Sequence, residues 1–546
     1  MKKTISYIFL LSLIVILFGC FNKGETYTVS FLYNHDNMGE YLKVKEINKG
    51  SLLSEPKKPT VEGYSFDGWF KDESCLETSK WIFTEMPVEN DISLYAKWVE
   101  KTLDELLYDE LFSEESKVSF DLDMDHSEWL KMQDDYNHYN SFNAKSPIYR
   151  KANYLKITLN GDTYQIDDVG VRMKGNTSRT DFYNDANGFY NLIHLKLSFQ
   201  ETFDDEDYYD NPMVFESDEK RAERKNRTFA GLAKIDMKWN KNLDNTYIRE
   251  IYALEMFRDY GIYAPNASLC DFKTTNKDIM SKMGVFIFYE TVDKDFLERH
   301  KISDTSGDLY KCAWKSSYTE TSSIGVEDDD KGLYYAYDLK TNKKKSTHQD
   351  LINLITSIKA DSSIDNLANL IDLDYFYNFE AVNFLVGNPD CIRNNYNNHY
   401  VYFNNHKAIF MPYDYDRVFG LNKDWNPASS MLLISPTSIK TAANSNNTVN
   451  PIYFSILKDA SAKKKLTDKI VEVAASKWFT FDHFKSYYDK YQANYSSSTT
   501  PDISFNNCDS RRLSFDINQG TTNIESTSEN ITFLYYISNK RIKEYA

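Results

Sequence analysis

Alternating apolar and polar positions predict β-strands in two separate regions of the chain. Residues 27–33 (YTVSFLY) and 91–98 (DISLYAKW) alternate as half-buried strands do, and Pro and Gly mark turns between them. A second group of strand-like runs lies at residues 154–160, 169–175 and 192–199. The pattern therefore predicts a small β module over residues 26–99 and a larger unit that begins with strands.

Two later stretches are predicted to be helices. Residues 247–261 place apolar side chains at helical spacing and end in Gly261, where a helix would stop. Residues 373–387 (LDYFYNFEAVNFLVG) form a second helical run, which is apolar and ends at Gly387. Strands followed by helices predict an α+β fold for residues 116–546, and the charged stretch 100–115 is predicted to be a linker with helical character.

A β-hairpin is predicted at residues 399–413, where HYVYF and KAIFMPY are joined by a turn at Asn404 and Asn405. Its outer ends would bring the Asn cluster that follows Asp390 close to Asp414. Acids at a strand end usually cap turns. Carboxylate and amide oxygens from neighbouring strand ends are also ligands that hold Mg²⁺. The spacing leaves both interpretations open.

The N-terminus has the features of an export signal. Lys2 and Lys3 precede the apolar run 5–19, and the run stops at Cys20. The stretch LFGC resembles a bacterial lipobox, in which Cys20 would be the lipidated residue. We predict a lipoprotein signal over residues 1–20 and a protein held on the outer face of the membrane by its lipid. An uncleaved anchor helix is the alternative, and it also implies export.

Composition and charge limit the classes of partner and the disulfide content that the protein can have. The chain has 546 residues, enough for more than one domain, and a net charge of −17. This charge argues against a nucleic-acid partner that is bound by neutralising phosphates. Six cysteines, one of them Cys20, are scattered without metal-ligand spacing, so we expect mostly free thiols with at most one bridge.

The β module carries a specific motif. Residues 59–72 (PTVEGYSFDGWFKD) and 87–98 (PVENDISLYAKW) closely resemble the Listeria–Bacteroides repeat, also called the internalin B-repeat. The resemblance implies a compact, ubiquitin-like β fold of the kind used as a spacer or adhesive unit on secreted bacterial proteins. We expect Trp69 and Trp98 to fill its core, because small domains need large rings.

The larger unit resembles the CotH family, the spore coat protein H kinases. Seven motifs carry the resemblance, and they occur in family order: GVRMKGNTSR, LKLSF, DNTYIREIYALEMFRDYGIYAP, GVFIFYETVDKDFL, LYK, NPDCIRNNYNNHYVYF and FMPYDYDRVFG. The resemblance implies a reduced, atypical protein-kinase-like fold over residues 116–546. It also implies transfer of a phosphoryl group from ATP to Ser of a partner protein, with Mg²⁺ as cofactor.

The resemblance also implies roles for single residues. Asp390 would orient or deprotonate the acceptor hydroxyl. Asn398 would bind metal, with Asn395 and Asn397 as competing candidates. Asp414, and with it Asp416, would bind the metal from the other strand end.

On the nucleotide side, Lys196 would pair with the ATP phosphates, although it also fits an ordinary exposed strand lysine. Arg172 and Lys174 would add positive charge, and Glu250 would pair with Lys196 as the helix glutamate of kinases does.

Three functions fit these features. The first is an exported, lipid-anchored CotH-type kinase. The second is an inactive kinase-like adhesin or scaffold on the cell surface, which the repeat and the anchor favour. The third is a metal-dependent hydrolase that uses the same acids, and no additional ligand cluster supports it. Retention of Asp390, an Asn and Asp414 together favours active chemistry.

Overall fold

The computed structural model describes residues 25–83, 85–176, 178–276, 279–421, 432, 435–437, 449–510, 513–524 and 529–540. The chain divides into two compact units, and the boundary between them in the sequence lies between Thr102 and Leu103. The predicted signal, residues 1–20 with Cys20, lies outside the described residues. Within them, no helix is both long enough and apolar enough to cross a membrane.

The first unit is a four-stranded sheet. Its strands are β1 (Thr26–Leu32), β2 (Glu40–Asn48), β3 (Tyr64–Phe70) and β4 (Ile92–Glu100), with a 3-10 turn, η1, at Glu77–Ser79. The spatial order is β2-β1-β4-β3, and β1 runs parallel to β4. Trp69 is buried with its ring edge against Phe31, and half-buried Trp98 packs on the same core. The expectation that these tryptophans fill the core is confirmed.

The second unit begins with the elements α1 (Leu103–Phe112), β5 (Val118–Asp123), α2 (His126–Asn140), β6 (Arg150–Leu159), β7 (Asp162–Lys174), β8 (Tyr183–Asn184), β9 (Gly188–Phe189), β10 (His194–Ser198), α3 (Asp218–Lys225), β11 (Lys234–Trp239), α4 (Arg249–Asp259), β12 (Ala267–Asn276) and β13 (Ile279–Glu290). Helix α1 occupies most of the predicted linker, and its Leu111 and Phe112 are buried in the core of this unit.

It continues with α5 (Lys294–Arg299), β14 (Leu309–Cys312), β15 (Ile324–Gly325), η2 (Asp329–Lys331), β16 (Tyr337–Leu339), α6 (Gln349–Ala360), α7 (Ile364–Leu370), α8 (Leu373–Val386), β17 (His399–Asn404), β18 (Lys407–Pro412), α10 (Pro451–Lys458), α11 (Ala460–Ala474), η4 (Lys477–Phe479), α12 (Phe481–Tyr495) and α13 (Phe533–Asn539). The unit is therefore a mixed α and β fold.

A closed barrel forms the first half of this unit, in the order β10-β11-β13-β12-β5-β6-β7. Side chains alternate between its two faces, so Leu195, Leu197 and Met237 enter the core while their neighbours point outward. The register places Lys196 opposite both Arg172 of β7 and Asp236 of β11. Several charged side chains consequently share one outer face of the barrel.

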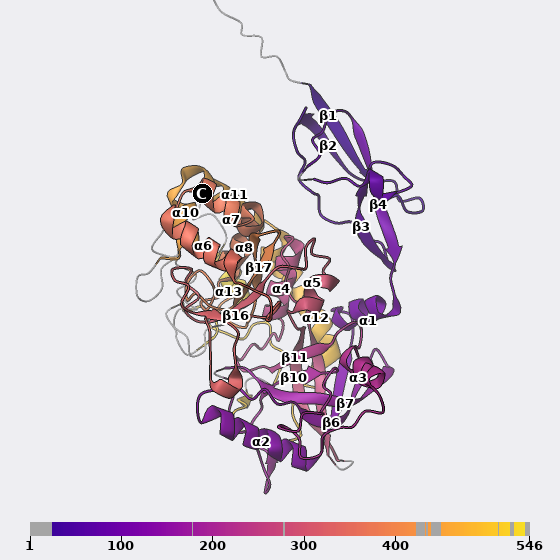
Figure 1. The fold of residues 1–546 in the computed structure, drawn as a ribbon, viewed down its shortest axis with the longest axis vertical. Helices are drawn as coiled ribbons and strands as arrows, with labels where there is room; N and C mark the ends of the chain where they lie inside the picture. The colour runs from indigo at the N-terminus through magenta and orange to yellow at the C-terminus, as the bar shows by residue number, and fades with distance from the viewer. Residues whose placement is uncertain are drawn as a thin grey trace, which may run out of the picture. The chain divides into compact units, whose positions relative to one another are not determined.

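A second sheet, in the order β15-β16-β14-β17-β18, forms the other half with its helices. The predicted hairpin is confirmed, since β17 and β18 pair from His399↔Pro412 to Asn404↔Lys407. Helix α8 packs against β18, α4 and α11. In Figure 1 the barrel strands β6, β7, β10 and β11 gather in the lower part of this unit, the helices α6, α7, α8, α10 and α11 gather in its upper part, and α4 lies between the two groups.

None of the described cysteines forms a disulfide. They are Cys75, Cys270, Cys312, Cys391 and Cys508. The expectation of mostly free cysteines holds for this set.

Candidate functional site

A buried lysine of the barrel connects the two halves of the second unit. Lys238 of β11 donates from Nζ to Glu250 Oε1 of α4 at 3.1 Å, and its ammonium also pairs with Asp414 just beyond β18. The side chains of Lys238 and Glu250 are only 10% and 4% exposed. Burial disfavours the charged form of Lys238 and alone would lower its pKa. The negative charges of Asp414 and Glu250 outweigh this effect and hold the pKa of Lys238 well above its usual range.

A second ion-pair group lies beside it on the same face of the barrel. Lys174 Nζ of β7 is 2.7 Å from Asp236 Oδ2, and Lys196 Nζ of β10 is 3.5 Å from Asp236 Oδ1. Burial alone would raise the pKa of Asp236, yet the two lysines lower it well below its usual range. Burial lowers the pKa of Lys196. Because this group contains two lysines and one aspartate, it carries a net positive charge.

The facing sheet adds one more cation and an aromatic ring. Lys311 of β14 donates to the Tyr413 hydroxyl at 3.0 Å and lies 4.2 Å from the centre of that ring. Lys174 approaches the same ring from the barrel side, at 5.6 Å. Tyr413 therefore lies between lysines of the two halves.

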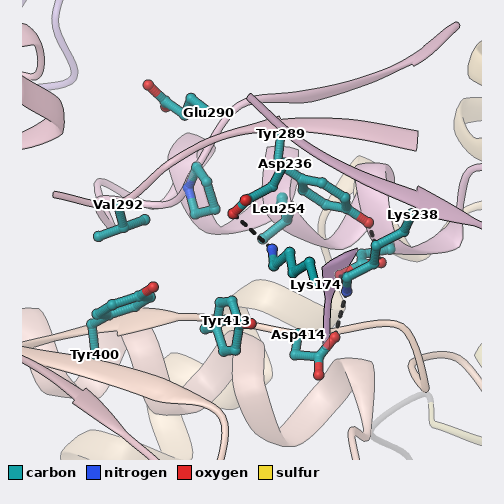
Figure 2. A pocket seen from close by; sticks show the side chains of 12 residues that line it. Lys174, Asp236, Lys238, Leu254, Tyr289, Glu290, Val292, Tyr400, Tyr413 and Asp414 are labelled. Carbon is teal, nitrogen blue, oxygen red and sulfur yellow. Dashed lines mark hydrogen bonds and ion pairs between the residues drawn. The ribbon is translucent and has the colours of Figure 1, made fainter. Parts of the chain in front are cut away.

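Most of these groups line one cavity, shown in Figure 2, whereas Lys196 and Lys311 are not part of its lining. Lys174 reaches toward Asp236 there, and Lys238 reaches toward Asp414. The lining residues are Lys174, Asp236, Lys238, Glu250, Leu254, Pro265, Tyr289, Glu290, Val292, Tyr400, Tyr413 and Asp414. Tyr289 closes one side by donating its hydroxyl to Glu250 Oε2 at 2.5 Å.

The ends of the hairpin bring Asn398 and Asp414 together. Asn398 directly precedes β17, Asp414 follows β18, and the Tyr413 N–H donates to the Asn398 carbonyl at 3.3 Å. Both residues have left-handed backbone, with φ of +52° and +58°. Residues other than Gly adopt this backbone conformation at a cost in free energy. Residues strained in this way cluster at functional sites.

Asp390 lies in the loop between α8 and β17, held by three side-chain amides. Asn395 and Asn397 donate to its Oδ1 at 2.6 and 3.0 Å, and Asn398 donates to its Oδ2 at 2.9 Å. Burial raises the pKa of Asp390, and the charge of Asp414 adds to this shift while the amides oppose it. The fold therefore places Asp390, the Asn cluster and Asp414 close together, as the predicted hairpin implied.

Asp414 and Asp416 have opposite electrostatic environments. Burial alone would raise the pKa of Asp414, but Lys238, Lys174 and Lys311 lower it well below its usual range. Burial and the charge of Asp414 raise the pKa of Asp416. Asp414 is therefore the better cation ligand of the two.

The predicted pair of Lys196 with Glu250 is wrong, because Glu250 pairs with Lys238. Closure of the barrel places β11, rather than β10, beside α4 and β13. Arg172 was predicted to add positive charge at the nucleotide site, but it does not line this cavity. It donates to the Ser146 carbonyl at 3.2 Å and lines a second pocket rather than this cavity.

Sequence reasoning did not assign Lys238, Asp236 or Lys311 to the site. A signal for the first two was present in residues 234–239 (KIDMKW), where polar and apolar side chains alternate and place both charges on one strand face. Lys311 lies in LYK, a motif that carries the family resemblance but had been given no role.

The donor set at this site combines acids and amides. Among the described residues, no group of three or more His, Cys, Asp and Glu side chains is placed to hold a metal ion. Asp414 and Asn398 instead offer a carboxylate and an amide oxygen, which are the kinds of ligand that Mg²⁺ prefers when substrate phosphates complete its shell. The residues present therefore fit a magnesium–nucleotide complex.

Comparison with family models identifies the larger unit. The model of the family described as CotH kinase protein matches residues 188–531. The chain belongs to the CotH kinase protein family. The Listeria-Bacteroides repeat domain matches residues 27–97. The protein is thus a kinase-like member of the CotH family with a Listeria-Bacteroides repeat before the kinase-like unit, as the motifs predicted.

Curated relatives match only a short part of the chain. Two proteins of Evansella cellulosilytica, named "Putative membrane protein" and "Putative Gly-rich membrane protein", are 44% and 43% identical over 74 and 72 residues. These matches cover 14% and 13% of this chain and 10% and 8% of the relatives. The chain spans a tenth or less of the length of these relatives.

A solved structure is also similar to part of the chain. The crystal structure of the Helicobacter pylori proinflammatory kinase CtkA is 11% identical, and the match covers 49% of this chain and 89% of that chain with a TM-score of 0.22.

Proposed function

We propose that the second unit is a protein kinase that transfers the γ-phosphoryl group of ATP to Ser of a partner protein and requires Mg²⁺. The carrying observation is that Lys238 pairs with Glu250 on a helix and with Asp414 after the hairpin. Kinases need a lysine–glutamate pair and a metal-binding Asp at the same phosphate site. Family membership supports the same activity.

On this proposal the lysines of the cavity hold the phosphates. Lys238 is the principal one and Lys174 is the other lysine of the lining, while Lys311 lies outside the lining but close enough to Asp414 to add charge. Mg²⁺, when bound, would neutralise negative charge on the phosphates. Asp414 and the side-chain oxygen of Asn398 are the ligands that this chain offers it. The Asn398 amide nitrogen donates to Asp390, so its oxygen is the atom available to a cation.

Asp390 is the residue that faces the acceptor hydroxyl in this proposal. Its carboxylate accepts from three amides, so its orientation is fixed before any acceptor binds. Burial raises its pKa, which makes it a stronger base than an exposed aspartate.

The experiment is incorporation of labelled phosphate from ATP by the purified protein, with and without Mg²⁺. Asp390→Asn and Asp414→Asn should each lower the rate of incorporation by about 10²-fold or more, whereas Asp374→Asn on the exposed start of α8 should leave it unchanged. Incorporation that is unchanged in both site variants would exclude kinase activity at this site. If Mg-ATP neither labels the protein nor raises its melting temperature, the inactive adhesin or scaffold becomes the better assignment.

We further propose that the protein is exported and held at the outer face of the membrane by lipid on Cys20. The N-terminal pattern, the surface-type repeat and the two relatives named as membrane proteins support this location. Cys20→Ala should move the protein from the membrane fraction to the soluble fraction of the producing cells. Retention in the membrane fraction would contradict the lipid anchor.

A further inference from the structure

A second pocket lies on the barrel, next to the cavity described above. Two arginines line it, Arg172 of β7 and Arg179 from the loop after that strand. Arg172 is two residues from Lys174 on the same strand face, a separation of about 7 Å. The pocket is nevertheless distinct, because it shares no lining residue with the first cavity.

Backbone carbonyls of one loop hold both guanidinium groups. Arg179 donates from Nη1 to the Ala144 carbonyl, and Arg172 donates from Nη1 to the Ser146 carbonyl at 3.2 Å. Arg172 also lies over the Tyr149 ring, 4.8 Å from its centre. These contacts fix the two side chains before a ligand arrives, which lowers the entropy lost on binding.

The two cations lack a counter-charge. Neither arginine forms an ion pair within the described part of the chain, and Arg179 Nε is buried there without a hydrogen-bond partner. The lining contains no carboxylate. Arg172 and Arg179 are half-buried, and a partly desolvated guanidinium group without a counter-charge gains free energy when an anion binds.

Two nearby carboxylates do not neutralise the pocket. Asp181 accepts from Gln133 Nε2 at 2.9 Å. Asp329 is close enough for the charge of Arg172 to act on it, but burial is the larger influence and raises the pKa of Asp329. Since neither acid is ion-paired to Arg172 or Arg179, both guanidinium groups keep donors for a ligand.

We infer that this pocket binds a phosphate monoester dianion, carried as a phosphorylated Ser or Thr on a polypeptide. Two arginine forks match the oxygens of such a group. Tyr136 adds a hydroxyl to the lining, and Met132, Ile148 and Met173 add an apolar wall. That wall suits the carbon atoms next to the phosphate better than it suits a bare ion. The site is independent of the proposed kinase activity, because binding there requires no nucleotide.

The test is binding of a fluorescent phosphoserine peptide to the full protein without ATP or Mg²⁺. The same peptide with unmodified Ser and inorganic phosphate serve as the other probes. The phosphopeptide should bind at least about tenfold tighter than the unmodified peptide, the difference expected for one charge-assisted contact. This preference should weaken at about 1 M salt, where charge interactions are screened.

Paired variants locate the binding. Arg172→Met with Arg179→Met should abolish the preference for phosphate, whereas Lys343→Met with Lys344→Met removes two exposed charges elsewhere and should not. Arg172→Lys with Arg179→Lys keeps the charge but loses the fork, so an intermediate affinity is expected. These lysine variants keep the test valid if the methionine variants fail to fold.

The other outcomes are also decisive. Inorganic phosphate that binds as tightly as the phosphopeptide, with the same loss in the arginine variants, would support the anion site but identify free phosphate as its ligand. Absence of any phosphate preference in the unmodified protein would overturn the site. A preference that survives in a folded Arg172→Met and Arg179→Met variant would overturn it too.

Discussion

Arg249 at the start of helix α4 is hydrogen-bonded to Phe419, in the segment that follows Asp414. Its Nη1 donates to the Phe419 carbonyl at 2.7 Å and to the Ile531 carbonyl at 2.8 Å, and the side chain is fully buried. Because Glu250 is the next residue, this contact also fixes the helix that presents Glu250 to Lys238. Three parts of the chain that are distant in sequence thus meet at one guanidinium group.

Arg249→Met should destabilise the second unit strongly. The change leaves the carboxylate of Asp244 and two carbonyls without their cationic donor, and breaking a buried pair of this kind costs roughly 3–5 kcal/mol. The free energy of unfolding from urea titration measures the effect. Arg258→Met on the same helix is the matched control, because Arg258 is partly exposed, and it should cost much less. Equal losses would contradict the anchoring role.

Lys238→Met should reduce phosphate incorporation by about 10²-fold or more, because a preorganised cation at the phosphate site is lost. Lys196→Met is the control on the neighbouring strand, and a much smaller loss is expected because Lys196 pairs with Asp236 rather than with Glu250. The initial rate with saturating acceptor protein measures both variants. A larger loss in Lys196→Met would return Lys196 to the role that the sequence suggested.

Asp390→Asn should lower the rate of phosphate transfer by roughly 10²–10⁴-fold, the usual contribution of a general base. The substitution keeps the size of the side chain, so nucleotide binding should change little. A fall in kcat with an unchanged KM for ATP is the expected result. An unchanged kcat would exclude Asp390 from the reaction.

The buried ion pairs of Glu290 should make the stability of the second unit depend on pH. Burial alone would raise its pKa, but His300 and Arg299 lower it to about 2, and its carboxylate is fully buried. The stabilisation is therefore complete above the unfolded value of 4.5 and is lost as pH falls from there toward 2. Its full size is roughly 3 kcal/mol.

Urea titrations between pH 2 and 7 test this prediction. The free energy of unfolding of Glu290→Gln should fall less steeply below about pH 4.5 than that of the unmodified protein. Glu298→Gln, an exposed change on helix α5, is the control and should leave the slope unaltered. Identical slopes in all three proteins would show that Glu290 is not the titrating group.

Elements with strong local patterns could be predicted from sequence. The hairpin follows from two alternating runs and an Asn–Asn turn, and its register then fixes Asn398 next to Asp414. Helix α4 follows from apolar spacing that ends at Gly261. Local periodicity decides these features, so distant parts of the chain are not needed to infer them.

The choice between lysines depends on contacts that no local pattern records. Lys196 and Lys238 lie on adjacent strands and point from the same face, so alternation treats them alike. Only closure of the barrel and the packing of α4 select Lys238 as the partner of Glu250. In the same way, Arg172 does not line the predicted site, because it donates to the Ser146 carbonyl in the loop between α2 and β6.

The ion pair between Lys238 and Asp414 has a consequence for the order of binding events. A triphosphate that binds the Lys238 ammonium alone weakens its attraction to the Asp414 carboxylate, and a divalent ion that binds Asp414 alone leaves Lys238 paired with Glu250 but without Asp414. Either ligand alone therefore weakens the ion pair between Lys238 and Asp414, whereas the two ligands together supply a new anion for Lys238 and a new cation for Asp414. Nucleotide and metal should consequently enter with positive cooperativity, each raising the affinity for the other.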